Sequence, residues 1–198
     1  DVPEVLPEIR DALRPGALVV SLCAGVHTEQ LEARLPDGTP VVRVMPNTPA
    51  QVAEGMAAIS AGAHAQQEHL DRVTAIMAAV GKVVTVPERY QDAVTAISGS
   101  GPAYLFFVVE AMIDAGVMLG LPRDIATTLV SQTMYGSAKL LIDSGEHPTV
   151  LRERVTSPGG TTAAALRELE AHRVKAAFMT AMEAARDRSE RLARPKDK

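Results

Sequence analysis

The sequence predicts an α/β region followed by an all-helical region, and three observations lead to this division. Over residues 1–90, short apolar runs alternate with segments of helical periodicity, the pattern of a layered α/β sheet. From Tyr90 onward only helical periodicity remains. Aromatic residues make up 3% of the 198 residues and Trp is absent, so aliphatic residues and Met must fill the interior, which favours a helix-rich protein. We therefore expect two domains, 1–90 and 91–198.

The elements expected in the first domain alternate between helices and strands. Ala17–Ser21 is a continuous apolar run, typical of a strand buried on both faces of a parallel sheet. Thr28 is a suitable N-cap for the helix that follows. In chain order we expect a helix ending at 15–16, a strand at 17–21, a helix at 28–35, strands at 41–44 and 56–60, a helix at 66–80 and a strand at 82–86. This order predicts the C-terminal part of a Rossmann-like parallel sheet, a dinucleotide-binding domain.

The second domain is expected to contain helices at about 90–97, 102–118, 123–143, 161–170 and 173–193. The glycines of Gly99–Pro102 follow a helix rather than a strand, which favours a helix–helix corner over a nucleotide-binding loop. Pro102–Leu121 is the most apolar stretch, but Glu110 and Asp114 share one of its helical faces, so we expect a buried helix rather than a membrane span. The helix at 123–143 has a wide apolar face, which predicts self-association.

Charge and cysteine content narrow the possible functions. The net charge is −4 with a pI near 5.7, and there is no dense Lys/Arg cluster, so neither nucleic acid nor an anionic membrane is an expected partner. The single cysteine, Cys23, excludes an intrachain disulfide framework, and no leader-like segment precedes it, which favours the cytoplasm. The five histidines have no ligand-type spacing, so we expect no metal site.

Two segments have the composition of ligand-binding sites. Met45-Pro46-Asn47 follows a predicted strand, at the sheet edge where open α/β folds bind ligands, although a plain turn explains it equally well. Ser157–Thr162 precedes a helix; its two glycines allow a ligand close to the backbone, and the free N–H groups of a helix start favour an anion. A simple Ser/Thr cap on a glycine-rich turn is the alternative for this second segment.

Five motifs together resemble one family, pyrroline-5-carboxylate reductase. They are VVRVMPNTPA at 41–50, DAVTAISGSGPAY at 92–104, GLP at 120–122, GEHP at 145–148 and VTSPGGTTAAAL at 155–166. The resemblance implies a Rossmann domain followed by a helical dimerisation domain, and the reduction of Δ1-pyrroline-5-carboxylate to proline with NADPH or NADH, the last step of proline biosynthesis. The family's glycine-rich nucleotide loop would lie before Asp1, so we expect a truncated member that is inactive as this fragment alone.

The resemblance also assigns roles to individual residues. Thr95, the threonine of the DAVTA motif, is implied to be the catalytic hydrogen-bond donor to the pyrroline nitrogen. The residues implied to hold the substrate carboxylate are Ser157, Gly159, Gly160, Thr161 and Thr162. Those implied to lie beside the nicotinamide and its ribose are Cys23, Ala24, Gly25, Met45 and Asn47.

Two alternatives remain at this point. A non-catalytic helical oligomerisation module of the same family would also lack the nucleotide loop. A related Rossmann hydroxyacid dehydrogenase would depend on a catalytic lysine, for which Lys139 is the candidate, although a helical lysine more often reaches into water.

Overall fold

The computed structural model describes residues 2–193 and divides into two compact units. The first unit is built on the sheet and comprises residues up to Pro102 together with Ala181 onward; the second comprises Ala103–Thr180. The division therefore falls after Pro102, whereas the expected domains meet at residues 90 and 91. The reason is packing, because the helical residues just after Tyr90 and the end of the last helix both contact the sheet unit.

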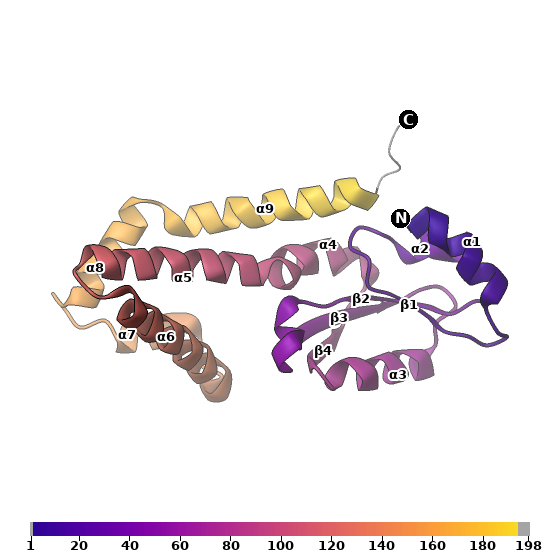
Figure 1. The fold of residues 1–198 in the computed structure, drawn as a ribbon, viewed down its shortest axis with the longest axis horizontal. Helices are drawn as coiled ribbons and strands as arrows, with labels where there is room; N and C mark the ends of the chain where they lie inside the picture. Colours follow the sequence, from indigo (N-terminus) through magenta and orange to yellow (C-terminus); the bar gives the residue numbers. More distant parts are fainter. Residues whose placement is uncertain (1, 194–198) are drawn as a thin grey trace. The chain divides into compact units, whose positions relative to one another are not determined.

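The sheet of the first unit has four strands in the order β1-β2-β3-β4 (Figure 1). They are β1 (Val19–Ser21), β2 (Val41–Met45), β3 (Gly55–Ala61) and β4 (Gly81–Thr85). β1 pairs parallel with β2 and β3 with β4, but β2 and β3 are antiparallel. The α/β class is confirmed, whereas the expectation of a purely parallel sheet is wrong. The connection over residues 46–54 contains only a short 3-10 helix, η1 (Thr48–Val52), and is too short for a parallel crossover.

Helices cover both faces of this sheet (Figure 1). On one face, α3 (Gln67–Ala78) packs through Val73 on a core that includes Val42, Val44 and Ile59. On the other face, α1 (Val2–Ala12) and α2 (Thr28–Glu32) enclose a second core around Val41. Because side chains alternate along a strand, Arg43 points to the same face as Val41.

β1 differs from its expected environment. It has a neighbour on one side only, so it is an edge strand of the described sheet, and Val20 is 40% exposed. The expectation of a strand buried on both faces is therefore wrong for this chain. A continuous apolar run shows that both faces suit burial, but the number of neighbouring strands depends on the whole sheet.

The segment Gly99–Pro102 does not form the expected corner. Helix η2 (Glu88–Tyr90) leads into α4 (Gln91–Val94), a π-helical segment η3 (Thr95–Gly99) and α5 (Gly101–Met118), which Figure 1 shows as one helical path. The Ser100 N–H donates to the Thr95 carbonyl at 2.8 Å, a bond five residues back along the chain. The π-helical turn absorbs the extra residue, so the helix continues through the glycines.

The remaining helices are α6 (Arg123–Ser144), α7 (Pro148–Arg154), α8 (Thr161–Ala171) and α9 (Val174–Ala193). The sequence did not predict α7, although Pro148 stands at its first turn, a favoured helical position for proline. His147 caps this helix by accepting a hydrogen bond from the Thr149 N–H at 3.2 Å.

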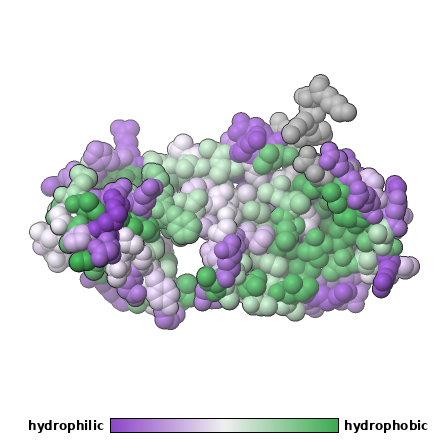
Figure 2. Space-filling model, in the orientation of Figure 1, coloured by the Kyte–Doolittle hydropathy of each residue, from purple (hydrophilic) through white to green (hydrophobic). Residues whose placement is uncertain are grey.

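The apolar helix α5 is not buried in the single chain. All of its residues are described, and none of them is buried; Phe106 and Phe107 are 66% and 71% exposed. Helix α6 likewise exposes Leu129, Leu140 and Ile142. Figure 2 shows apolar side chains as green areas on the face in view. The expectation of a buried helix is thus wrong for the single chain.

Candidate functional site

The end of β2 is joined to the helix that carries Thr95. Asn47 follows β2, and its side-chain Nδ2 donates a hydrogen bond to the Ser98 carbonyl at 3.1 Å. Its Oδ1 accepts from the Met56 N–H at 2.8 Å, at the start of β3. Two segments about fifty residues apart in the sequence, MPN at 45–47 and the DAVTAISGSGPAY motif at 92–104, therefore meet within the first unit.

Gly99 allows this close approach. A Cβ atom at Gly99 would lie 2.5 Å from Met45 Cε, so a side chain there would push the methionine or the helix away. The predicted residues Met45, Asn47 and Thr95 are thus gathered around the π-helical segment. Both Met45 and Asn47 are half-buried, as is Thr95.

Thr95 begins the π-helical segment, and its side chain is hydrogen-bonded to Gln91. The Thr95 hydroxyl donates to the Gln91 carbonyl at 2.8 Å. The Gln91 side chain is fully buried, and its Nε2 donates to the Ala58 carbonyl at 3.2 Å and to Ser60 Oγ at 2.8 Å. Sequence reasoning missed Gln91, because a single amide in a helix has no local feature that announces burial against a strand.

A buried arginine links the same helix to the sheet. Arg43 on β2 is 1% exposed; its Nη1 lies 3.4 Å from Glu88 Oε1 and its Nη2 lies 3.9 Å from Asp92 Oδ1. Glu88 also accepts hydrogen bonds from the N–H and hydroxyl of Thr28, at 2.7 and 2.6 Å. Asp92 accepts from Ser189 Oγ at 2.6 Å, which ties the end of α9 to α4. The sequence predicted a strand over 41–44 but no partner for Arg43, so this network was also missed.

The segment Cys23–Gly25 follows β1; its first two residues are exposed and its third is buried. Cys23 and Ala24 are exposed, so both are accessible to a ligand. Gly25 is buried with a φ of +71°, and a Cβ atom there would lie 2.7 Å from Leu192 Cβ on α9. The packing of α9 thus explains why position 25 is glycine.

In the second unit, Ser157–Thr162 forms a tight turn that starts α8. Gly159 has a φ of +67°, and Gly160 is the N-cap residue, its N–H donating to the Ser157 carbonyl at 3.0 Å. A Cβ atom at Gly160 would collide with Ser157 Oγ. Within residues 2–193 no side chain caps this helix, so the turn is not the Ser/Thr-capped alternative. Its first N–H groups and the positive end of the helix dipole suit an anion.

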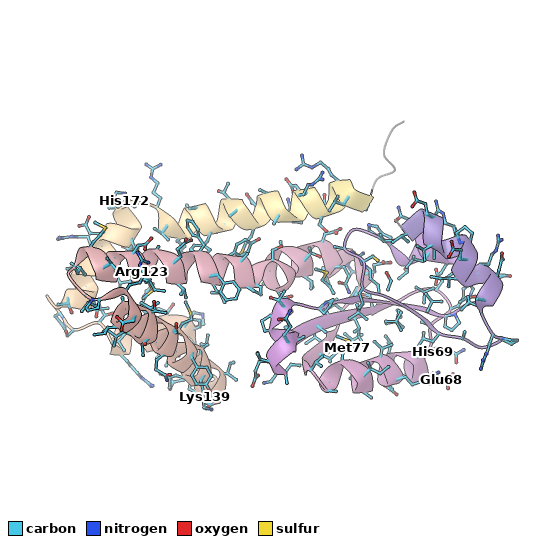
Figure 3. All side chains as sticks on the ribbon, viewed as in Figure 1. Glu68, His69, Met77, Arg123, Lys139 and His172 are labelled. Carbon is cyan, nitrogen blue, oxygen red and sulfur yellow. The ribbon has the colours of Figure 1, made fainter. Side chains whose placement is uncertain are left out.

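Side chains that could act as an acid, a base or a metal ligand also lie outside the segments that contain the predicted site residues. Figure 3 shows Lys139 on α6, where its Nζ lies 2.5 Å from Asp143 Oδ2 on an exposed face. His69 on α3 accepts a hydrogen bond from the Gln66 N–H at 2.9 Å and so helps to start that helix. Among the described residues, no group of three His, Cys, Asp or Glu side chains could hold a metal ion.

A sheet flanked by helices, with small and polar residues where its strands end and a helical unit after it, is the architecture of a Rossmann-type oxidoreductase. Comparison with known proteins narrows this class to one family. Residues 88–192 match the family model for pyrroline-5-carboxylate reductase dimerisation. The chain therefore belongs to the pyrroline-5-carboxylate reductase family.

Individual relatives agree with this assignment. The pyrroline-5-carboxylate reductase of Synechocystis sp. is 45% identical over 96% of this chain and 72% of its own length. That of Mycobacterium tuberculosis is 48% identical over 87% of this chain and 64% of its own length. The crystal structure of Plasmodium falciparum pyrroline carboxylate reductase with NADP bound is similar at a TM-score of 0.91 and 35% identity, covering 98% of this chain and 78% of that one. This chain thus spans 64 to 72% of the length of the two relatives.

These matches confirm the family, the α/β then all-α organisation and the reductase class predicted from the sequence. They also remove the alternative of a hydroxyacid dehydrogenase that depends on Lys139. The match to a dimerisation model indicates a homodimer.

Proposed function

We propose that the protein reduces Δ1-pyrroline-5-carboxylate to L-proline in the cytoplasm, with NADPH or NADH as the hydride source, as the last step of proline biosynthesis. The observation that supports this most directly is the convergence of Met45, Asn47 and Thr95 at one end of the sheet in a member of this family.

The turn before α8 is the proposed site of the substrate carboxylate. Gly159 and Gly160 expose the backbone, and the N–H groups at the start of α8 carry partial positive charge. The hydroxyls of Ser157, Thr161 and Thr162 add donors. Hydrogen bonds to a charged group contribute about 1.5–3 kcal/mol each, so two or three of them suffice to orient a small acid.

Thr95 is the proposed contact of the ring nitrogen. Its proton is directed at the Gln91 carbonyl, so the hydroxyl oxygen is left to accept a hydrogen bond. An imine that arrives protonated brings the N–H that this oxygen accepts. Hydride addition to the carbon of such an iminium yields the neutral amine of proline directly, and the protein need not supply a further proton. The donor role expected for Thr95 is thus replaced, in this proposal, by an acceptor role.

The end of the sheet offers a surface that fits a nicotinamide. Cys23 and Ala24, which follow β1, are small and exposed, and Met45 provides an apolar side chain at the end of the neighbouring strand β2. When bound, the nicotinamide supplies the hydride from its C4 position. These residues orient the flat ring, and holding two reactants face to face is worth effective molarities of about 10⁵ M or more. The NADP bound by the Plasmodium falciparum relative supports a nicotinamide dinucleotide as the cofactor.

The proposed partners are the substrate, the cofactor and further copies of the chain. We place the contact between copies on the C-terminal helices, as a homodimer or a higher homo-oligomer, and propose neither nucleic acid nor membrane as a partner. The stretch Glu88–Met118 is long and apolar enough to cross a membrane by length and composition. Its apolar residues are the ones that a second copy is expected to cover.

The test is turnover by the full-length protein. Wild type is incubated with Δ1-pyrroline-5-carboxylate and NADPH or NADH, and proline is measured by chromatography. Thr95→Val is expected to lower kcat/KM about 10- to 100-fold, the value of one hydrogen bond to a charged group. Thr127→Val is the matched control, because the Thr127 hydroxyl also donates to a carbonyl four residues back, at 2.8 Å, on an exposed face of α6. Binding of proline without any turnover would instead favour a non-catalytic oligomerisation module.

A further inference from the structure

The Ser98 carbonyl lacks its ordinary helical partner. In a continuing α-helix this carbonyl would accept from the N–H four residues later, but that residue is Pro102, which has no backbone N–H. The Asn47 side chain supplies the missing donor at 3.1 Å. A contact from the end of β2 therefore reaches the one carbonyl of the π-helical segment that proline deprives of its α-helical donor.

The same segment is anchored on its other side. Gln91, four residues before Thr95, is held against β3 by its buried amide. Ser98, three residues after Thr95, is held by Asn47. Thr95 thus lies between two side-chain amides that fix the helix to the sheet, and π-helical turns of this kind are often found at functional sites.

We propose that Asn47 is a positioning residue that acts through Thr95. The Asn47 amide bridges β3 and the π-helical segment, and this bridge sets the place of the Thr95 hydroxyl relative to the end of the sheet. This inference rests on the proposed function, because it gives Asn47 an effect on the reaction only where Thr95 contacts the substrate. It differs from the predicted role of Asn47 as a cofactor contact, which involves the same side chain but not Ser98.

The variant Asn47→Asp isolates the contact to Ser98. An aspartate keeps an oxygen to accept from the Met56 N–H, but a carboxylate cannot donate to the Ser98 carbonyl. We expect kcat to fall about 10- to 100-fold, the effect of misplacing a reacting contact by about 1 Å, with a much smaller change in KM. Gln67→Glu is the matched control, since it makes the same chemical change at an exposed amide on α3.

Two further variants distinguish positioning from a general structural role. In a Thr95→Val background, Asn47→Asp is expected to lower kcat by less than about threefold more, because residues that act as a unit are not additive. Pro102→Ala provides an N–H for the Ser98 carbonyl, so it is expected to restore part of the kcat lost in Asn47→Asp. Should Asn47→Asp fail to fold, Asn47→Ala removes the same donor without adding charge.

The outcomes separate the two ideas. If wild type forms proline and Thr95→Val is impaired, but Asn47→Asp has the kcat of wild type or its loss multiplies fully with that of Thr95→Val, the positioning role is refuted alone. Failure of the wild type to form proline refutes the proposed function and the positioning role with it. Full activity of Thr95→Val refutes the Thr95 contact and the positioning role, while the reduction itself stands.

Discussion

Removal of the buried guanidinium of Arg43 should destabilise the first unit strongly. Arg43→Met keeps an unbranched apolar stem but leaves the carboxylates of Glu88 and Asp92 without their cation. The side chains of these acids are only 21% and 13% exposed, so water compensates them poorly. Both also lie on the segment that leads to Thr95, so the same change loosens the base of the candidate site.

The structure sets the size of the effect. Breaking a buried ion pair by removing one partner costs about 3–5 kcal/mol. Glu88 retains two hydrogen bonds from Thr28, and Asp92 retains one from Ser189, so we expect the lower end of that range, about 3 kcal/mol. For a chain of this size, that loss corresponds to a fall in Tm of about 6 to 12 °C.

Urea denaturation followed by circular dichroism, at a fixed protein concentration, measures this loss. Arg10→Met is the control, because Arg10 pairs with Asp11 on an exposed part of α1, and we expect no measurable change. Adding Glu88→Gln and Asp92→Asn to Arg43→Met should recover much of the stability, since the buried uncompensated charges are gone. A loss below about 1 kcal/mol in Arg43→Met, or no recovery in the combined variant, would refute the reasoning.

Three other changes have defined outcomes. Gly25→Ala combines a positive φ with a collision against α9, so urea denaturation should show a loss of about 1–3 kcal/mol. Gly160→Ala forces Ser157 to move, and isothermal titration should show proline bound about tenfold more weakly. The hydrogen bond from Arg10 lowers the pKa of Asp11 below its ordinary value of 3.8, so the ion pair is present above pH 3.8 and is lost as the pH falls through the lowered pKa. Because both side chains are exposed, the effect of the pair on stability is expected to be too small to measure. Titration of Asp11 by NMR in Arg10→Gln should return that pKa towards 3.8.

Each of these predictions has a contrary result. Unchanged stability of Gly25→Ala would mean that α9 is not in contact with the segment after β1. Unchanged proline affinity of Gly160→Ala would place the carboxylate elsewhere. An Asp11 pKa that is the same with and without Arg10 would show that the ion pair does not persist in solution.

Local features of the sequence were enough for much of this protein. Apolar runs predicted all four strands, and helical periodicity predicted the long helices, because both patterns arise from neighbours a few residues apart. The glycines at 159 and 160 predicted the tight turn before α8, since a positive φ is a property of single residues. The five motifs, taken together, predicted the family, and the resemblance rather than any local pattern assigned a role to Thr95.

The tertiary structure alone decided the features that depend on distant residues. The burial of Arg43, the burial of Gln91 and the bond from Asn47 to Ser98 all join segments far apart in the sequence. No local pattern encodes such a partner, because the same asparagine serves equally well in a plain turn. The exposure of α5 depends on still more, since apolar residues show that a helix will be covered but not whether the cover comes from its own chain or from another copy.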